Sequence, residues 1–124
     1  MSASEIGKKL CDLCKEGRNL EAIESLYSPD IVSVEAAPME GLPQTMEGID
    51  AVRGKNEWWY ANNEVHEGSV SGPYSHGENR FAVHFAMDVT SKESGQRMNF
   101  EEIGLYTVSD GKIVREEFFY GTPN

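Results

Sequence analysis

His84 has the side-chain type and the sequence surroundings that best fit acid–base chemistry. Residues 80–90 alternate between polar and apolar types, which predicts a β-strand with Ala82 and Ala86 beside His84 on one face. These small neighbours would leave space for a ligand, and histidine titrates near neutral pH, as a general acid or base should. The alternative is a buried histidine that only hydrogen-bonds a neighbouring group.

Two turns predict which other side chains share the face of His84. The dipeptide Asp110-Gly111 is a strong signal for a tight turn between the last two strands, and it places Leu105 opposite Glu116. The preceding hairpin loop places His84 opposite Ile103. A slip of one residue would move all side chains of a strand to the other face. In this register the face of His84 also carries Glu101, Ile103, Leu105, Glu116, Phe118 and Tyr120.

Glutamates occur as two doublets, Glu101-Glu102 and Glu116-Glu117, on adjacent predicted strands. Neighbouring side chains on a strand point to opposite faces, so one member of each doublet should face inward or lie at an interface, where it needs a partner. A carboxylate of Glu101 or Glu116 beside His84 could fix the tautomer of the histidine. The alternative is that either glutamate pairs with a nearby arginine at a rim or interface.

The elements that position these residues are predicted from hydrophobic periodicity and turn residues. Helical spacing predicts helices over residues 3–16, from Asn19 to the breaker Ser28-Pro29, and over about residues 49–62. A loop is expected over residues 37–47. The order of elements, ααβαββββ, indicates an α+β fold. Strands are predicted over residues 31–36, 65–74, 80–90, 97–108 and 113–120.

The third predicted helix contains the aromatic run Trp58-Trp59-Tyr60. Adjacent side chains on a helix lie about 100° apart, so the three cannot all face the core. Trp59 continues the apolar stripe of Ile49 and Val52, which favours packing in the core. Trp58 or Tyr60 is expected at the mouth of a pocket or at a subunit contact.

Cys11 and Cys14 have the spacing of a redox motif. A thioredoxin-like site has that motif at the start of a helix that follows a strand, whereas these cysteines fall inside the first predicted helix. The sequence has no second cysteine pair to complete a zinc site, and its three histidines are scattered. We therefore expect structural cysteines and no bound metal.

Length and charge fit one domain and exclude several kinds of partner. The 124 residues suit a single domain over residues 1–124. With 21 acidic and 11 basic residues, the net charge of −10 argues against nucleic acid and against anionic membrane surfaces. The sequence shows neither an apolar run of ~20 residues nor a secretory leader, so a cytoplasmic location is predicted.

Residues 106–120 (YTVSDGKIVREEFFY), together with the order of elements, resemble the SnoaL-like branch of the NTF2-like superfamily. Residues 20–31 (LEAIESLYSPDI), 48–52 (GIDAV) and 80–85 (RFAVHF) fit the same family, and the chain is most similar to its short bacterial members. The resemblance implies a cone in which three helices pack on a strongly curved, mostly antiparallel sheet. It also implies a pocket at the open end, no cofactor, and a homodimer formed through the sheet.

The family's catalytic positions carry other residues in this sequence. Cyclases and epoxide hydrolases have a catalytic aspartate where this chain has Phe118, and the cyclases have a histidine near Ile103. The arginine and aspartate of the epoxide hydrolases fall on His84 and Ala86. Ketosteroid isomerases have their base near the end of the first strand, where Glu35 is the nearest match. The alternative for Glu35 is an exposed carboxylate at a strand end.

Taken together, these observations predict a protein that binds a small, largely apolar organic molecule in the cone. Catalysis, if present, would be proton transfer of the isomerase, cyclase or lyase type, with His84, Glu35 and Glu116 as the catalytic groups. The alternatives are a binding module without catalysis and a dimeric interaction domain whose cone is filled by its own side chains. The predicted pocket residues are Tyr27, Trp58, Trp59, Glu101, Ile103, Leu105, Phe118 and Tyr120.

Overall fold

The chain forms helices and strands in the order that the sequence predicts, as described by a computed structural model over residues 1–38 and 41–121. The predicted first strand, however, begins at Tyr27 rather than Ile31, and the predicted loop before the third helix contains a short strand. The helices are α1 (Ala3–Lys15), α2 (Asn19–Leu26) and α3 (Ile49–Asn62). The strands are β1 (Tyr27–Val34), β2 (Thr45–Glu47), β3 (Asn63–His76), β4 (Arg80–Ser91), β5 (Arg97–Ser109) and β6 (Lys112–Phe119).

Local signals explain where α1 begins and ends. Ser2 accepts a hydrogen bond from the backbone N–H of Glu5 at 3.1 Å, and the Glu5 carboxylate accepts one from the backbone of Ser2. This capping box satisfies N–H groups that lack partners inside the helix. Gly17 follows the helix with a φ of 73°, a left-handed conformation that glycine adopts without strain.

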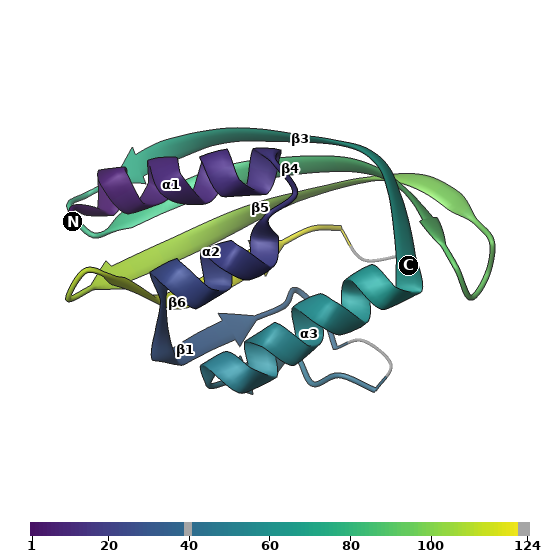
Figure 1. The fold of residues 1–124 in the computed structure, drawn as a ribbon, viewed down its shortest axis with the longest axis horizontal. Coiled ribbons are helices and arrows are strands. Elements are labelled where there is room, and N and C mark those ends of the chain that lie inside the picture. The colour runs from purple at the N-terminus through teal and green to yellow at the C-terminus, as the bar shows by residue number, and fades with distance from the viewer. Residues whose placement is uncertain (39–40, 122–124) are drawn as a thin grey trace.

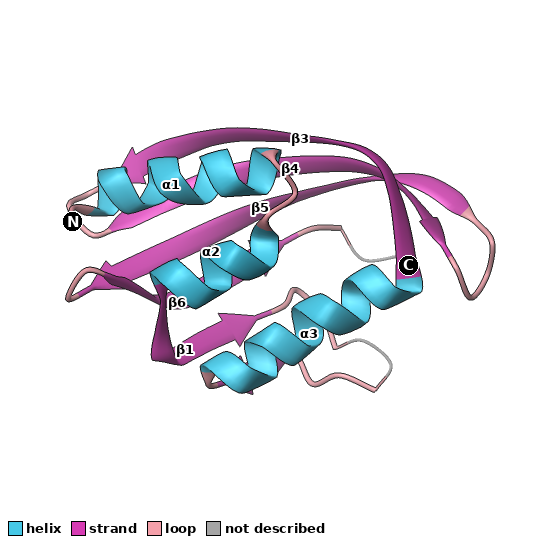
Figure 2. Cartoon of the chain, viewed as in Figure 1, coloured by secondary structure: helices cyan, strands magenta, loops and turns pink. Residues whose placement is uncertain are grey.

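The strands form one curved sheet in the order β2-β1-β6-β5-β4-β3, and the helices lie together on one of its faces (Figure 1). All neighbouring strands are antiparallel except β1 and β6, which are parallel. β3 leaves the end of α3, bends, and runs along α1, so that the sheet curls around the helices (Figure 2). These features confirm the predicted NTF2-like α+β fold.

The predicted register is right for one hairpin and wrong for the next. His84 pairs with Ile103 as expected, but Glu116 pairs with Tyr106 and not with Leu105. The β5–β6 ladder shifts between Thr107 and Val108, and such an irregularity exchanges the faces of the strand beyond it. Glu116 and the following alternate residues of β6 therefore lie on the face opposite to His84.

The face of the sheet that meets the helices carries the core. The rings of Phe81 and Tyr106 are stacked there with their centroids 5.0 Å apart, and both side chains are buried. Burial of such aromatic side chains supplies much of the hydrophobic stabilisation of a small domain. Other buried residues of this core are Ile6, Leu10, Ile23, Leu26, Val52 and Val83.

Gly7 lies at a close contact between α1 and the sheet. A Cβ at this position would lie 2.8 Å from Cβ of Pro73 and 3.2 Å from the ring of Phe81. The change Gly7→Ala is therefore expected to lower the free energy of unfolding by about 1–2 kcal/mol, because overpacking outweighs the better helix propensity of alanine. Urea denaturation would measure the change.

Gly54 of α3 provides the matched control, because a Cβ there would have no atom within 4 Å. The change Gly54→Ala should raise the free energy of unfolding by about 0.5–1 kcal/mol through helix propensity alone. If both variants were stabilised alike, the packing argument for Gly7 would be wrong.

Candidate functional site

A cavity of about 600 Å³ lies between the helices and the concave face of the sheet. This volume is within the range of small-molecule sites. Its wall is mostly apolar, and most of the polar groups that reach it come from α3, β5, β6 and the residues at the two ends of β1. Large side chains that line it include Trp59, Phe85, Met87, Phe100, Tyr106 and Phe118.

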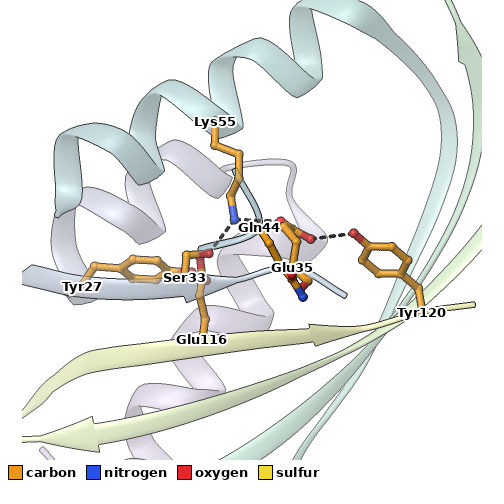
Figure 3. A network of polar contacts seen from close by, with 7 residues as sticks. All are labelled: Tyr27, Ser33, Glu35, Gln44, Lys55, Glu116 and Tyr120. Atoms are coloured by element: carbon orange, nitrogen blue, oxygen red, sulfur yellow. Dashed lines mark hydrogen bonds and ion pairs between the residues drawn. The ribbon is translucent and has the colours of Figure 1, made fainter. Parts of the chain in front are cut away.

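An ion pair between Lys55 and Glu35 lies at the polar end of this cavity. Nζ of Lys55 is 2.8 Å from Oε1 of Glu35, and the two side chains are only 9% and 11% exposed. The hydroxyl of Tyr120 donates a hydrogen bond to the other carboxylate oxygen of Glu35 at 3.1 Å. Figure 3 shows Lys55 reaching down from α3 and Tyr120 approaching from the opposite side. Both oxygens of Glu35 are thus held in place.

The backbone of Glu35 is fixed as well. Its N–H donates to the carbonyl oxygen of Gln44 at 2.8 Å, and the side-chain amide of Gln44 donates to the Glu35 carbonyl at 3.1 Å. These contacts join the segment after β1 to the segment before β2 (Figure 3). The carboxylate of Glu35 is therefore attached to a well-supported backbone, although it lies outside the regular strand.

Glu116 forms a second buried group next to this ion pair. It accepts a hydrogen bond from the hydroxyl of Ser33 at 2.8 Å and another from the hydroxyl of Tyr27. Lys55 also donates to the Ser33 hydroxyl at 2.5 Å, so Ser33 links the lysine to Glu116. Glu116 is 3% exposed, and this burial raises the pKa of its carboxyl although Lys55 and the two hydroxyls act in the opposite direction.

Glu102 of β5 is a third carboxyl group at the cavity, and it has a different environment. It pairs across the sheet with Phe85, and no hydrogen bond or ion pair to its carboxyl is found within residues 1–38 and 41–121. Burial, together with the nearby negative charges of Glu35 and Glu116, raises the pKa of Glu102 to about 8, although Lys55 acts in the opposite direction. Glu102 is therefore mostly protonated at neutral pH.

The sequence analysis did not identify Lys55 or Glu102 as site residues. Lys55 follows Val52 by three positions on α3, so its place on the buried stripe was visible in the helical spacing. Glu102 belongs to a glutamate doublet of which one member was expected to face inward. It was assigned to the face opposite to His84, and the structure confirms that assignment but shows that this is the cavity face.

The predicted site residues divide between the two faces of the sheet. His84 lies on the outer face, with its Nε2 3.4 Å from Oε1 of Glu101, because the alternate residues Val83 and Phe85 of the same strand point into the core. The predicted grouping of His84 with Glu116 is therefore corrected. The predicted residues that line the cavity are Glu35, Glu116, Tyr27, Trp59, Phe118 and Tyr120. Those that do not line it are His84, Trp58, Glu101, Ile103 and Leu105.

The two cysteines are free thiols in α1, as expected for structural residues. Burial raises the pKa of Cys14 to about 12, which leaves a poor nucleophile.

In the part of the chain that the structure describes, no three His, Cys, Asp or Glu side chains are arranged to hold a metal ion. No helix among the described residues is long and apolar enough to cross a membrane.

Residues 1–120 match the model of the SnoaL-like domain family, and the chain therefore belongs to this family. A search of curated proteins finds no significant match. Among solved structures, a proposed SnoaL-like polyketide cyclase from Mesorhizobium loti, also labelled a carbohydrate phosphatase, is 47% identical with a TM-score of 0.90. The alignment covers 97% of this chain and 100% of that one.

More distant structures share the fold. A proposed isomerase from Bacillus subtilis is 19% identical with a TM-score of 0.78, over 98% of this chain and 90% of that chain. A proposed SnoaL-like polyketide cyclase from Jannaschia sp. CCS1 is 15% identical with a TM-score of 0.73, over 94% and 83% of the two chains. At these identities the similarity concerns the fold alone. One fold carries many activities, so function has to be argued from the site.

Proposed function

We propose that the protein binds a small, largely apolar organic molecule in the cavity and moves a proton on that molecule without a cofactor. The observation that carries this proposal is the buried Lys55–Glu35 pair, which opens onto an apolar cavity of about 600 Å³. An apolar cavity next to this carboxylate would hold the ligand with a C–H group close to the carboxylate oxygens, and such positioning of the reacting groups supplies much of the rate of a proton transfer.

In the proposed reaction Glu35 takes a proton from a carbon atom next to a carbonyl group and returns it to another position. Lys55 and Tyr120 keep the carboxylate oriented, because each holds one of its oxygens. Glu116 acts as a positioning residue through Ser33, which it shares with Lys55. His84 has no part in this proposal, since it lies on the outer face of the sheet.

Exchange of α-protons measures this activity directly. The wild-type protein should accelerate deuterium incorporation into 2-tetralone, followed by proton NMR in D₂O. Glu35→Gln should lower the rate about 10²-fold or more, because the amide cannot accept the proton. Glu57→Gln, an exposed change on α3, removes the same charge and should leave the rate unchanged.

A binding module without catalysis is the second candidate. It is favoured by the fact that both oxygens of Glu35 already accept hydrogen bonds, which makes the carboxylate less available as a base. Saturable binding of 2-tetralone without any acceleration of exchange would support this candidate and contradict the catalytic one. A cone filled by Phe118 and Tyr120, the third alternative, is hard to reconcile with the cavity that both residues line.

A homodimer through the outer face of the sheet remains a proposal. It is supported by exposed apolar side chains on that face, among them Ile103 and Phe119, which pair across β5 and β6. Exposed apolar groups that lie on one sheet are typical of contact surfaces. The cavity lies on the concave face of the sheet, opposite to this surface.

A further inference from the structure

We infer that the ligand of this cavity carries an ammonium group and that Glu102 is the carboxylate that receives it. The inference rests on the proposed function in one respect, namely that the cavity binds a small organic molecule. It adds the chemical class of that molecule and a specificity-determining residue that takes no part in the proposed proton transfer.

The charges at the cavity are unequal. Three carboxyl groups line it, those of Glu35, Glu102 and Glu116, whereas Lys55 is the buried cation. The ammonium group of Lys55 is already engaged, because it donates to Glu35 and to Ser33 and lies 5.2 Å from the centre of the Phe118 ring. An ammonium ligand would take the place of the proton on Glu102 and leave the net charge of the cavity unchanged, whereas an anionic ligand would add negative charge to a cavity with more carboxyl groups than buried cations.

The wall around Glu102 also suits a cation. Phe85 lies opposite Glu102 on β4, and Phe100 precedes Glu102 by two residues on the same face of β5. On the other side is Gly104, and the ring of Tyr106 lies over it. The rings of Phe100 and Tyr120 lie 5.7 Å apart at this end of the cavity. Aromatic faces attract alkylammonium groups, so rings and a carboxylate together form a better site for an amine than for a neutral polar group.

The inference predicts that binding of the ligand releases a proton, which can be measured. The free protein holds a proton on Glu102 at neutral pH, and an ammonium ligand would bind the ionised form. Binding of the cation therefore releases the proton of Glu102 to solvent, and the ligand keeps its own proton. The charged groups that face this site from other elements are Glu35, Lys55 and Glu116, with the exposed Lys15 at the edge of the cavity.

The phenol and thiol groups at the site stay neutral throughout. Burial raises the pKa values of Tyr60, Tyr106 and the thiol of Cys14, and burial together with Glu35 raises the pKa of Tyr120 to about 12. The proton released near pH 7 would therefore come from a carboxyl group with a raised pKa, Glu102 or Glu116, and the Glu102→Gln variant distinguishes the two.

Three probes with the same skeleton test the inference: 4-phenylbutylamine, 4-phenylbutan-1-ol and 4-phenylbutyrate. Isothermal titration calorimetry at pH 7 would compare phosphate and HEPES buffers, whose ionisation enthalpies differ and which contain no primary amine. The amine should bind at least tenfold more tightly than the alcohol, and the carboxylate most weakly. Close to one proton should be released per bound amine and none per bound alcohol.

Variants assign the effect to Glu102. Glu102→Gln should weaken binding of the amine at least tenfold and abolish proton release, while affinity for the alcohol stays the same. Glu57→Gln, which removes an exposed carboxylate from α3, should leave all three affinities as they are in the wild type.

The outcomes separate the two proposals. If the alcohol or the carboxylate binds as tightly as the amine, the inference is wrong and the proposed ligand site stands. If none of the three probes binds, both fail. The comparison of the three probes uses the wild-type protein. It therefore tests whether the cavity prefers an ammonium group even if the Glu102 variant does not fold.

Discussion

The change Lys55→Met is expected to lower the free energy of unfolding by about 3–5 kcal/mol. The substitution preserves much of the apolar stem but removes the positive charge that lies between Glu35 and Ser33. Glu35 would then keep only Tyr120 as a partner, and Glu116 would lose the nearby cation that favours its ionised form. An uncompensated buried carboxylate is far more costly than the loss of an exposed ion pair. Chemical denaturation at pH 7 would measure the difference.

Two further variants show whether the missing charge is the cause. Lys8→Met removes an exposed lysine from α1 and should change the stability by no more than about 0.5 kcal/mol. Adding Glu35→Gln to Lys55→Met should restore part of the lost stability, because the carboxylate no longer needs a cation. Equal stability of the Lys55 and Lys8 variants would contradict the buried pair.

A second large effect is expected from Glu102 and depends on pH. An ordinary glutamate in the unfolded chain loses its proton near pH 4.5, whereas Glu102 in the folded protein keeps its proton until about pH 8. The folded state thus binds the extra proton between these values, so the contribution of Glu102 to stability decreases as the pH rises. The slope is up to about 1.4 kcal/mol per pH unit for one proton.

The variant Glu102→Gln cannot ionise and should lack this dependence. Its stability relative to the wild type should therefore increase steadily between pH 5.5 and 7.5, as followed by urea denaturation at several pH values. Glu57→Gln should show no such trend, since that side chain is exposed. A constant difference between Glu102→Gln and the wild type would mean that Glu102 ionises like an ordinary glutamate.

The pH dependence predicted for Glu102 also bears on the ligand. The cost of ionising Glu102 arises from burial and from the charges of Glu35 and Glu116, and an ammonium group beside Glu102 would offset it. A bound amine should therefore reduce the pH dependence of stability in the wild type. Ligand recognition and the stability of the empty cavity would depend on the same carboxyl group.

Local sequence signals predicted the elements well. The apolar stripe of α3 and the turn at Asp110-Gly111 act over a few residues, and each is found where it was expected. β2 was missed because a strand as short as Thr45–Glu47 shows little alternation, and its existence depends on pairing with β1.

The candidate site was predicted only in part. Glu35, Tyr27 and Trp59 reach the cavity as expected, and Glu116, Phe118 and Tyr120 reach it although they were assigned to the face of His84. His84 itself lies on the outer face. The irregularity of the β5–β6 ladder separates Glu116, Phe118 and Tyr120 from His84, and no residue type in that hairpin indicates it. The outer position of His84 follows from Val83 and Phe85, which point into the core from the same strand.

The sequence by itself therefore determined the order of helices and strands, the family and the presence of inward-facing glutamates, because periodicity and turn chemistry are local properties. Only the tertiary structure decided which glutamates meet in the cavity and that Lys55 joins two of them. That decision depends on the register between strands and on the distance between α3 and β1, which are set by packing across the whole domain.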